Sequence, residues 1–332
     1  MLERLTIVVP TFNGARRLPN LLASIMSQNY DRSLYDILVV DDDSSDDTRE
    51  IAESFGAQVV RNGHRDIEYG KSIGISKANT DLVLFLDDDL VLPHTEWLKR
   101  QVAVLHRYPE AIGAQPGRFL LKRSDPLINR WCSMFGCVDP IVFYLGRRDH
   151  LAINENAWSL AGKVVAEDSD CWVIEFVDTN VPTIGSNGYI TRRSTIMLAN
   201  WWPQYFHIDN SLDIIRRGRR RVIITKDEIY HANCTTISQQ VTKLRRNASL
   251  WLKYSQLRTY KYEVPPIKLM MTVLSMITVV RPLLDAVRMY VKTRDAAAFL
   301  HVYLSFKIPI MYMSILGWRK LRELATSTRV PA

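Results

Sequence analysis

Three consecutive carboxylates, Asp87, Asp88 and Asp89, follow an apolar run of strand type, Leu84-Phe85-Leu86. Adjacent negative charges repel one another and raise the free-energy cost of burying each carboxylate. A hard divalent cation removes that cost, because Mg²⁺ and Mn²⁺ prefer carboxylate oxygens as ligands. Mg²⁺ held by one or two carboxylates usually completes its shell with water and substrate phosphates. The triplet therefore indicates a site for a metal–diphosphate complex; a solvated acidic turn or a helix N-cap is the alternative.

A second acidic run, Asp41-Asp42-Asp43, follows another apolar segment. Strand-like segments alternate with segments of helical periodicity: strands at 5–10, 35–40, 58–60 and 82–86, and helices at 17–28, from 46 onward and at 71–78. This alternation predicts a doubly wound α/β fold with a mostly parallel sheet. Ligands of such sheets bind beyond the carboxyl ends of the strands. Since both acidic runs follow strands, we expect them to meet at one edge of the sheet.

The chain after residue 115 alternates less regularly. Its expected elements are strands at 173–177, 189–191 and 221–225, a further strand ending at 231, a loop at 181–188 and a helix at 208–217. The loop contains Gly185, Asn187 and Gly188, residue types that adopt positive φ in turns. Gly218 follows the helix and is a typical C-cap.

Bulk composition predicts a folded protein of one large domain or two smaller ones. The 332 residues are 47% hydrophobic, with no low-complexity stretch. We expect no cleavable signal, because Met1-Leu2-Glu3-Arg4 leads directly into strand-like residues. The four cysteines show no Cys-x-x-Cys spacing, which indicates reduced cytosolic thiols.

The excess positive charge lies in the C-terminal quarter. Residues 251–332 carry 13 Lys/Arg and 4 Asp/Glu, whereas the rest carries 30 basic and 31 acidic residues. The apolar run 269–280 is shorter than the roughly 20 residues that a membrane span needs. The run 296–318 contains Lys307, which costs about 2.5–3.5 kcal/mol near the middle of a span, and Pro309. We therefore expect two or three amphipathic helices on the cytoplasmic face of an anionic membrane, without crossing it. The alternative is a helical subdomain packed on the rest of the protein; no nucleic-acid-binding motif is present.

Three segments occur in the order and spacing of a known family: TIVVPTFN at 6–13, ILVVDDDSSDDT at 37–48 and VLFLDDDL at 83–90. Over about residues 3–255 the chain resembles glycosyltransferase family 2, whose members have the GT-A fold. These enzymes take a sugar from a nucleotide diphosphate and invert its anomeric carbon. The resemblance implies a GT-A catalytic domain at residues 1–255, followed by a basic, amphipathic, membrane-associated helical region at 256–332.

The resemblance also implies a set of donor-binding residues. They are Pro10, Thr11, Asn13, Asp41, Asp42, Lys71, Asp88 and Asn187. Asp42 would accept hydrogen bonds from the base, uracil or guanine. Lys71 stands where family members often have arginine, so it keeps the charge but lacks the bidentate guanidinium. Mg²⁺ or Mn²⁺ would be held by Asp87 and Asp89, with His231 either a third ligand or a core histidine.

The family's general base lies at the start of a helix, which matches residues 207–218 here. The resemblance implies that Asp209 is this base and that Asp213, one turn later, braces the site; the reverse assignment stays open. Residues 239–246 resemble a degraded form of the Gln-x-x-Arg-Trp motif of processive members. The tryptophan is missing, which favours the addition of a single sugar.

The expected function is thus metal-dependent, inverting transfer of one sugar from a nucleotide-diphosphate sugar to a lipid-linked or glycan acceptor. A polyprenyl-phosphate sugar synthase is the nearest alternative, since its anionic acceptor needs no base. A nucleotidyltransferase is disfavoured because residues 10–14 lack a glycine-rich, basic loop. A non-catalytic sugar-nucleotide-binding protein is the third alternative. The sequence leaves the sugar, the base and the acceptor open.

Overall fold

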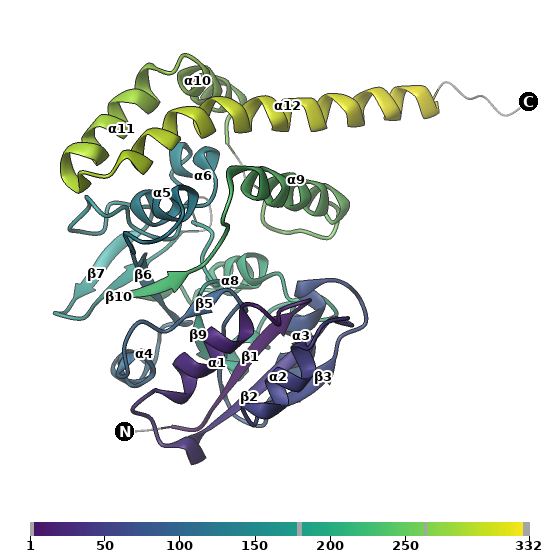
Figure 1. Cartoon of the computed structure of the whole chain (residues 1–332), viewed down its shortest axis with the longest axis vertical. Helices are drawn as coiled ribbons and strands as arrows, with labels where there is room; N and C mark the ends of the chain where they lie inside the picture. The colour runs from purple at the N-terminus through teal and green to yellow at the C-terminus, as the bar shows by residue number, and fades with distance from the viewer. Residues whose placement is uncertain (1–2, 178–180, 262–263, 328–332) are drawn as a thin grey trace, which may run out of the picture.

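The computed structural model describes residues 3–177, 181–261 and 264–327, with side chains as far as Ile315. A large sheet has the order β3-β2-β1-β4-β9-β6-β10-β8-β7, with β5 paired to β10. Figure 1 shows this α/β body between the N-terminus at one end and the last helices of the chain at the other. The strands are β1 Leu5–Thr11, β2 Tyr35–Asp41, β3 Gln58–Arg61, β4 Leu82–Phe85, β5 Leu90–Val91, β6 Ala114–Phe119, β7 Lys163–Glu167, β8 Cys171–Glu175, β9 Ile190–Arg192 and β10 Arg221–His231.

The first half of the chain builds the parallel part of the sheet. Strands β3, β2, β1 and β4 pair in parallel, and so do β6 and β10. Strands β9, β8, β7 and β5 join by antiparallel pairing. All seven residues of β1 are buried, as is usual for a strand covered on both faces. The predicted mostly parallel α/β sheet is confirmed.

Helices connect and cover the strands. They are α1 Leu18–Met26, α2 Thr48–Ser54, α3 Ile67–Lys77, α4 Trp97–Arg107, α5 Leu127–Phe135, α6 Pro140–Tyr144, α7 Arg193–Ile196, α8 His207–Arg216, α9 Ile237–Lys253, α10 Pro266–Ile277, α11 Val280–Thr293 and α12 Leu300–Ser327, with short 3₁₀ turns at Arg32–Leu34 and Ala296–Phe299. The expectation for α3 was wrong at its start, because Asp66 caps the helix by accepting a hydrogen bond from the Glu68 N–H. The earlier start places Glu68 on the same helix as Lys71.

Two expectations for the second half of the sheet were also wrong. The segments 221–225 and the strand ending at 231 form one strand, β10, whose register against β6 shifts between Thr225 and Glu228. Strand β8 begins and ends two residues earlier than expected. A register shift can bend a strand and redirect its end, and β10 here goes on to pair with β5 through His231.

The C-terminal helices pack on the α/β body. Ala297, Leu304 and Ile308 share one hydrophobic cluster with Trp131 and Phe135 of α5. Figure 1 shows the last part of α12 extending away from the rest of the molecule. The expected apolar run 296–318 ends beyond the last described side chain. This packing favours the subdomain alternative for the attached face of the helices and leaves the expected membrane contact a prediction.

Candidate active site

The carboxyl ends of β1, β2 and β4 bring the two acidic runs together. Thr11 at the end of β1 lies opposite Asp41 at the end of β2. The Asp42 N–H donates to the Thr11 carbonyl at 2.9 Å, and the Thr11 hydroxyl donates to Asp88 at 2.7 Å. The expected meeting of the two runs at one sheet edge is therefore observed.

Asp88 serves the architecture of this edge. Arg17 donates from Nε and Nη2 to the two carboxylate oxygens of Asp88, each at 2.9 Å. Burial raises the pKa of Asp88, and the hydrogen bond from Arg17 opposes that rise. Both oxygens are bonded within the chain, so its expected contact with the donor stays a prediction.

Asp89 has an unsatisfied oxygen. Its Oδ2 lies 3.4 Å from Nε2 of His231 and 3.5 Å from Nζ of Lys243, while its buried Oδ1 has no hydrogen-bond partner among the described residues. Burial alone would raise the pKa of Asp89, but the positive charges of His231 and Lys243 outweigh burial and lower it. Asp87 lies beside Lys71, with 3.8 Å between Oδ1 and Nζ. Oxygen ligands with an unmet atom fit a divalent cation.

A tighter group of possible metal ligands lies elsewhere. Among the residues that the structure describes, Asp168, Asp170 and Cys171 bring their ligand atoms within 4.8 Å of one another. Arg107 donates to Asp168 and to Asp170, each at 2.7 Å. The guanidinium already neutralises these carboxylates, so this group is an ion-pair network. Asp89, by contrast, keeps one buried oxygen without a partner among the described residues.

The loops after β1 and β2 are tied to each other. Asn13 has φ 47°, and its Oδ1 accepts from the Ser45 N–H at 2.9 Å. Asp41 is fully buried and accepts from Nε of Arg49 at 2.6 Å. Asp42 accepts from the Arg65 N–H at 2.6 Å, and burial raises its pKa. The loops therefore hold the carboxylates in fixed positions beside the strand ends.

The expected general base, Asp209, is held by several hydrogen bonds. Asp209 accepts from Nε and Nη2 of Arg258, both at 2.6 Å, and from the N–H groups of Thr259 and Tyr260 at 2.6 and 2.9 Å. Asp213 lies one turn later on α8, and burial raises its pKa. The roles of Asp209 and Asp213 stay predictions, but the geometry shows that Asp209 anchors the segment after α9.

The loop at 181–188 adopts the expected positive φ angles. Asn187 has φ 47° and Gly188 has φ 88°. A Cβ at Gly188 would lie 2.8 Å from Ile229, so this turn also needs glycine for space. Pro10 lies at the other end of the site, beside Gly70 of α3. No described contact tests whether Asn187 or Pro10 touches a donor.

Sequence reasoning missed four residues at this edge: Phe12, Glu68, His207 and Lys243. Phe12 is an aromatic residue with 45% of its surface exposed. Lys243 comes from α9, far along the chain, and donates to Asn233 at 2.6 Å while facing Asp89. Glu68 and His207 both contain buried polar atoms without partners. The sequence could have indicated Phe12, because it is an apolar residue in a polar loop. The proximity of the other three residues to this edge depends on tertiary packing.

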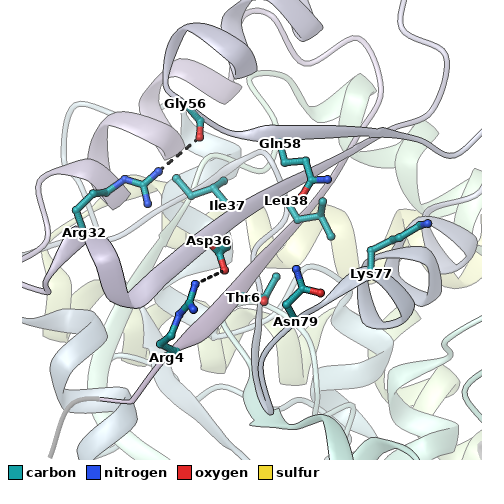
Figure 2. Close-up of a pocket in the computed structure, with 10 residues that line it drawn as sticks. All are labelled: Arg4, Thr6, Arg32, Asp36, Ile37, Leu38, Gly56, Gln58, Lys77 and Asn79. Carbon is teal, nitrogen blue, oxygen red and sulfur yellow. Dashed lines mark hydrogen bonds and ion pairs between the residues drawn. The ribbon is translucent and has the colours of Figure 1, made fainter.

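A surface hollow lies at the opposite edge of the sheet. Figure 2 shows it between the starts of β1 and β2, lined by Arg4, Thr6, Asp36, Gln58 and Lys77 among others. Arg4 there pairs with Asp36 at 3.2 Å. None of the expected site residues lines this hollow. Parallel sheets bind ligands at the carboxyl ends of their strands, so we place the active site at the other edge.

Comparisons with known proteins identify a family and a fold. Residues 6–155 match the family model described as Glycosyl transferase family 2. Glycosyltransferase AglE of Haloferax volcanii is 30% identical over 106 residues, which are 30% of this chain and 34% of that protein. A 4,4'-diaponeurosporenoate glycosyltransferase of Staphylococcus haemolyticus is 32% identical over 134 residues, 38% of this chain and 35% of that protein. The chain thus spans about a third of the length of these relatives.

A solved structure has the same fold. Mannosyltransferase PcManGT from Pyrobaculum calidifontis, solved in complex with GDP-Man and Mn²⁺, superposes with a TM-score of 0.51 over 97% of this chain and 80% of its own. The sequence identity is 15%. At that identity the likeness concerns the fold alone, and it confirms the expected GT-A type of sheet.

Proposed function

The chain belongs to glycosyltransferase family 2, and on that premise we propose that it moves one sugar from a nucleotide-diphosphate sugar to an acceptor, with inversion. The observation that carries the proposal is the Asp89 carboxylate. One of its oxygens faces His231 and Lys243, and the other is buried without a partner. A buried acceptor without a partner costs about 1–3 kcal/mol, so a ligand that binds it is strongly favoured.

The donor would lie along the ends of β1, β2 and β4. Asp42 would bind the base, with Pro10, Thr11, Asn13 and Asp41 shaping the nucleotide loop. The buried ammonium of Lys71 would face the diphosphate. Burial alone would lower the pKa of Lys71, but Asp87 and Glu68 outweigh burial and raise it, so its positive charge is secure at pH 7. Asn187 would approach the donor from the loop before β9.

Asp87 and Asp89, with His231, would hold Mg²⁺ or Mn²⁺. A bound cation would stabilise the negative charge that develops on the departing diphosphate. The chain's own cations reinforce that stabilisation, because Lys71 faces Asp87 and Lys243 faces Asp89. The presence of Mn²⁺ and GDP-Man in the mannosyltransferase structure supports a divalent cation and a nucleotide-sugar donor.

The bonding of Asp209 bears on the acceptor. A general base must be within hydrogen-bond reach of the proton that it removes and must have an oxygen free to take it. In this structure Arg258 and two backbone N–H groups occupy the carboxylate of Asp209. This observation favours a second candidate function, a polyprenyl-phosphate sugar synthase, because a phosphate acceptor is already anionic. Transfer to a hydroxyl acceptor would require Asp209 to break its ion pair with Arg258, or Asp213 to serve as the general base.

The helices after α9 would attach the enzyme to an anionic membrane. Of the 28 exposed large hydrophobic side chains described, 16 lie within residues 266–315, although that segment is a small part of the chain. Ile267, Met271, Val280 and Leu284 are each more than half exposed. Basic residues accompany them, since residues 251–332 carry 13 Lys/Arg and 4 Asp/Glu. Apolar side chains beside basic ones suit an interfacial position on anionic lipid.

One helix in the described part of the chain, Ala296–Ile315, is long and apolar enough to cross a membrane, and 39% of its apolar 18-residue window is buried inside the protein. Helices α10 and α11, bent by 65° at their junction, pass the same test only as a pair. His301, Leu304 and Ile308 of the candidate span are buried against the body. This packing supports attachment to the membrane surface over a crossing.

Calorimetric titration with UDP, GDP, UDP-glucose, UDP-GlcNAc and GDP-mannose, with Mn²⁺ and with EDTA, tests the donor half of the proposal. We expect one nucleotide sugar to bind with Mn²⁺ and to bind at least tenfold more weakly in EDTA. Equal binding in EDTA would overturn the metal site. The acceptor class follows from the product made on membrane extracts, since a glycosyl phosphate is cleaved by mild acid and an ordinary glycoside is not.

A further inference from the structure

Besides Oδ1 of Asp89 and Nδ1 of His231, two further buried polar atoms at the active-site edge have no hydrogen-bond partner among the described residues. They are Oε2 of Glu68 and Nδ1 of His207. Glu68 lies in the first turn of α3, one turn before Lys71, and His207 is the first residue of α8. Buried polar atoms are nearly always paired in native proteins, so each exception calls for a water or a ligand.

The two atoms share the same charged surroundings. Burial raises the pKa of Glu68, and the positive charges of Lys71 and Arg258 oppose that rise. Burial, reinforced by the same two cations, holds the pKa of His207 well below its usual value. His207 is therefore neutral at pH 7, and its ring nitrogens offer one donor and one acceptor. The chain thus presents a carboxylate and a neutral imidazole beside two fixed cations.

Glu68 and His207 lie between the expected metal ligands and Asp209. Lys71 links them to the metal end through its pair with Asp87, at 3.8 Å. Arg258 links them to the other end through its pair with Asp209, at 2.6 Å. The Tyr205 N–H donates to the Glu68 carbonyl at 3.0 Å. Gly185 lies next to His207, because a Cβ added at Gly185 would be 3.2 Å from Cβ of His207.

We propose that Glu68 and His207 bind hydroxyl groups of the donor sugar and so determine which nucleotide sugar the enzyme accepts. This inference rests on the proposed function, since it places the sugar between the diphosphate end and Asp209. A carboxylate accepts a hydrogen bond from a hydroxyl, and a neutral imidazole can donate or accept one. Epimeric sugars differ in the direction of one hydroxyl. A wrong epimer would leave a buried atom of this pair unmet, and that penalty gives selectivity.

The experiment compares full-length wild type with Glu68→Gln and His207→Asn, after thermal melting has shown that each variant folds. Calorimetry with Mn²⁺ measures the dissociation constant of the preferred nucleotide sugar of the panel and of its free nucleotide diphosphate. We expect each variant to bind the nucleotide sugar about tenfold more weakly and the free diphosphate within twofold of wild type. Glu53→Gln, on the exposed face of α2, is the matched control and should change neither constant.

Three results would overturn the inference. Unchanged nucleotide-sugar affinity in both folded variants would mean that water alone meets these atoms. Equal losses of affinity for the nucleotide sugar and for the free nucleotide diphosphate would mean that the two residues contact the nucleotide and not the sugar. An unchanged order of preference among sugars that share one nucleotide would remove their role in selectivity. If Glu68→Gln does not fold, Glu68→Asp and His207→Asn decide the question. Failure of every probe to bind wild type would instead overturn the proposed function.

Discussion

Buried carboxylates and imidazoles are hydrogen-bonded to different extents at the donor edge and in the layer where the C-terminal helices meet the body. At the donor edge, Asp89 and Glu68 each keep a buried oxygen without a partner. In the helical layer, Asp295 accepts from Arg130 at 2.9 Å and caps the turn at Ala297. His301 in the same layer shares a hydrogen bond with the Tyr144 hydroxyl at 2.8 Å and accepts one from Trp131 Nε1 at 3.3 Å.

The difference distinguishes polar groups that bind a ligand from polar groups that stabilise the fold. A polar group whose bonds are made within the chain stabilises the fold, and its loss should appear in the free energy of unfolding. A polar group left unmet costs stability, and its loss should appear in ligand binding. Asp209 belongs with the first kind, although the family pattern places it among the second. The following changes test that separation.

Asp89→Ala should give the largest effect. We expect turnover to fall by about 10³-fold or more, because cation binding at such a site is worth several kcal/mol of transition-state stabilisation. The variant should also be less stable, because the pairs with His231 and Lys243 that lower the pKa of Asp89 are lost, so turnover is compared at a temperature where the variant is folded. Turnover and thermal melting measure the two effects. Asp47→Ala, at an exposed helix start, is the control; retained turnover in Asp89→Ala would refute the metal site.

Asp295→Ala should show the opposite pattern. Its carboxylate is almost fully buried and pairs with Arg123 and Arg130. Removing one partner of a buried pair and a helix-cap acceptor together should lower the free energy of unfolding by about 3 kcal/mol. Donor affinity of the folded variant should stay within twofold. Denaturant unfolding provides the measurement, and Asp36→Ala, from an exposed pair with Arg4, should cost less than about 1 kcal/mol. A cost no larger than that of the control would mean that the layer is only loosely packed.

His301 should make this layer sensitive to acid. Burial, helped by the charge of Arg148, lowers the pKa of His301 to about 3. Unfolding restores a pKa of roughly 6.5, so the unfolded state binds the proton first as the pH falls. The stabilising contribution is therefore complete above about pH 6.5 and is lost between there and about pH 3. At pH 5 the loss should be about 2 kcal/mol, from about 1.4 kcal/mol per pH unit. Denaturant unfolding of wild type and His301→Gln from pH 7 to 5 checks this, and parallel pH profiles would contradict it.

Lys292→Ala should give the smallest effect and probes the outer face of the same helices. Lys292 is exposed in the last turn of α11. One basic residue near an anionic surface contributes about 1 kcal/mol, so vesicle binding should weaken about fivefold at low salt and less at high salt. Flotation with phosphatidylserine vesicles measures it. Lys77→Ala, beside the hollow of Figure 2, should leave binding unchanged. Equal effects of the two changes would assign the attraction to net charge alone.

The sequence by itself determined the class of fold and the edge at which the two acidic runs of the candidate site meet. Periodicity separated strands from helices because burial on both faces leaves apolar runs, as in β1. The acidic runs then had to meet, since parallel strands end at the same edge. Helix boundaries were less certain, because caps such as Asp66 act through single hydrogen bonds.

Only the tertiary structure decided which polar residues are already bonded within the chain. Asp209 and Asp89 read alike as sequence, each a carboxylate beside a strand or helix end. Arg258, 49 residues away, occupies the first, whereas Lys243 and His231 leave one oxygen of the second unmet. Packing also places Glu68 and His207, which are distant in sequence, near the charges of Lys71 and Arg258. Hydrogen bonds and ion pairs depend on distances of about 3 Å between atoms that folding alone brings together, so local patterns cannot foretell which partners each carboxylate finds.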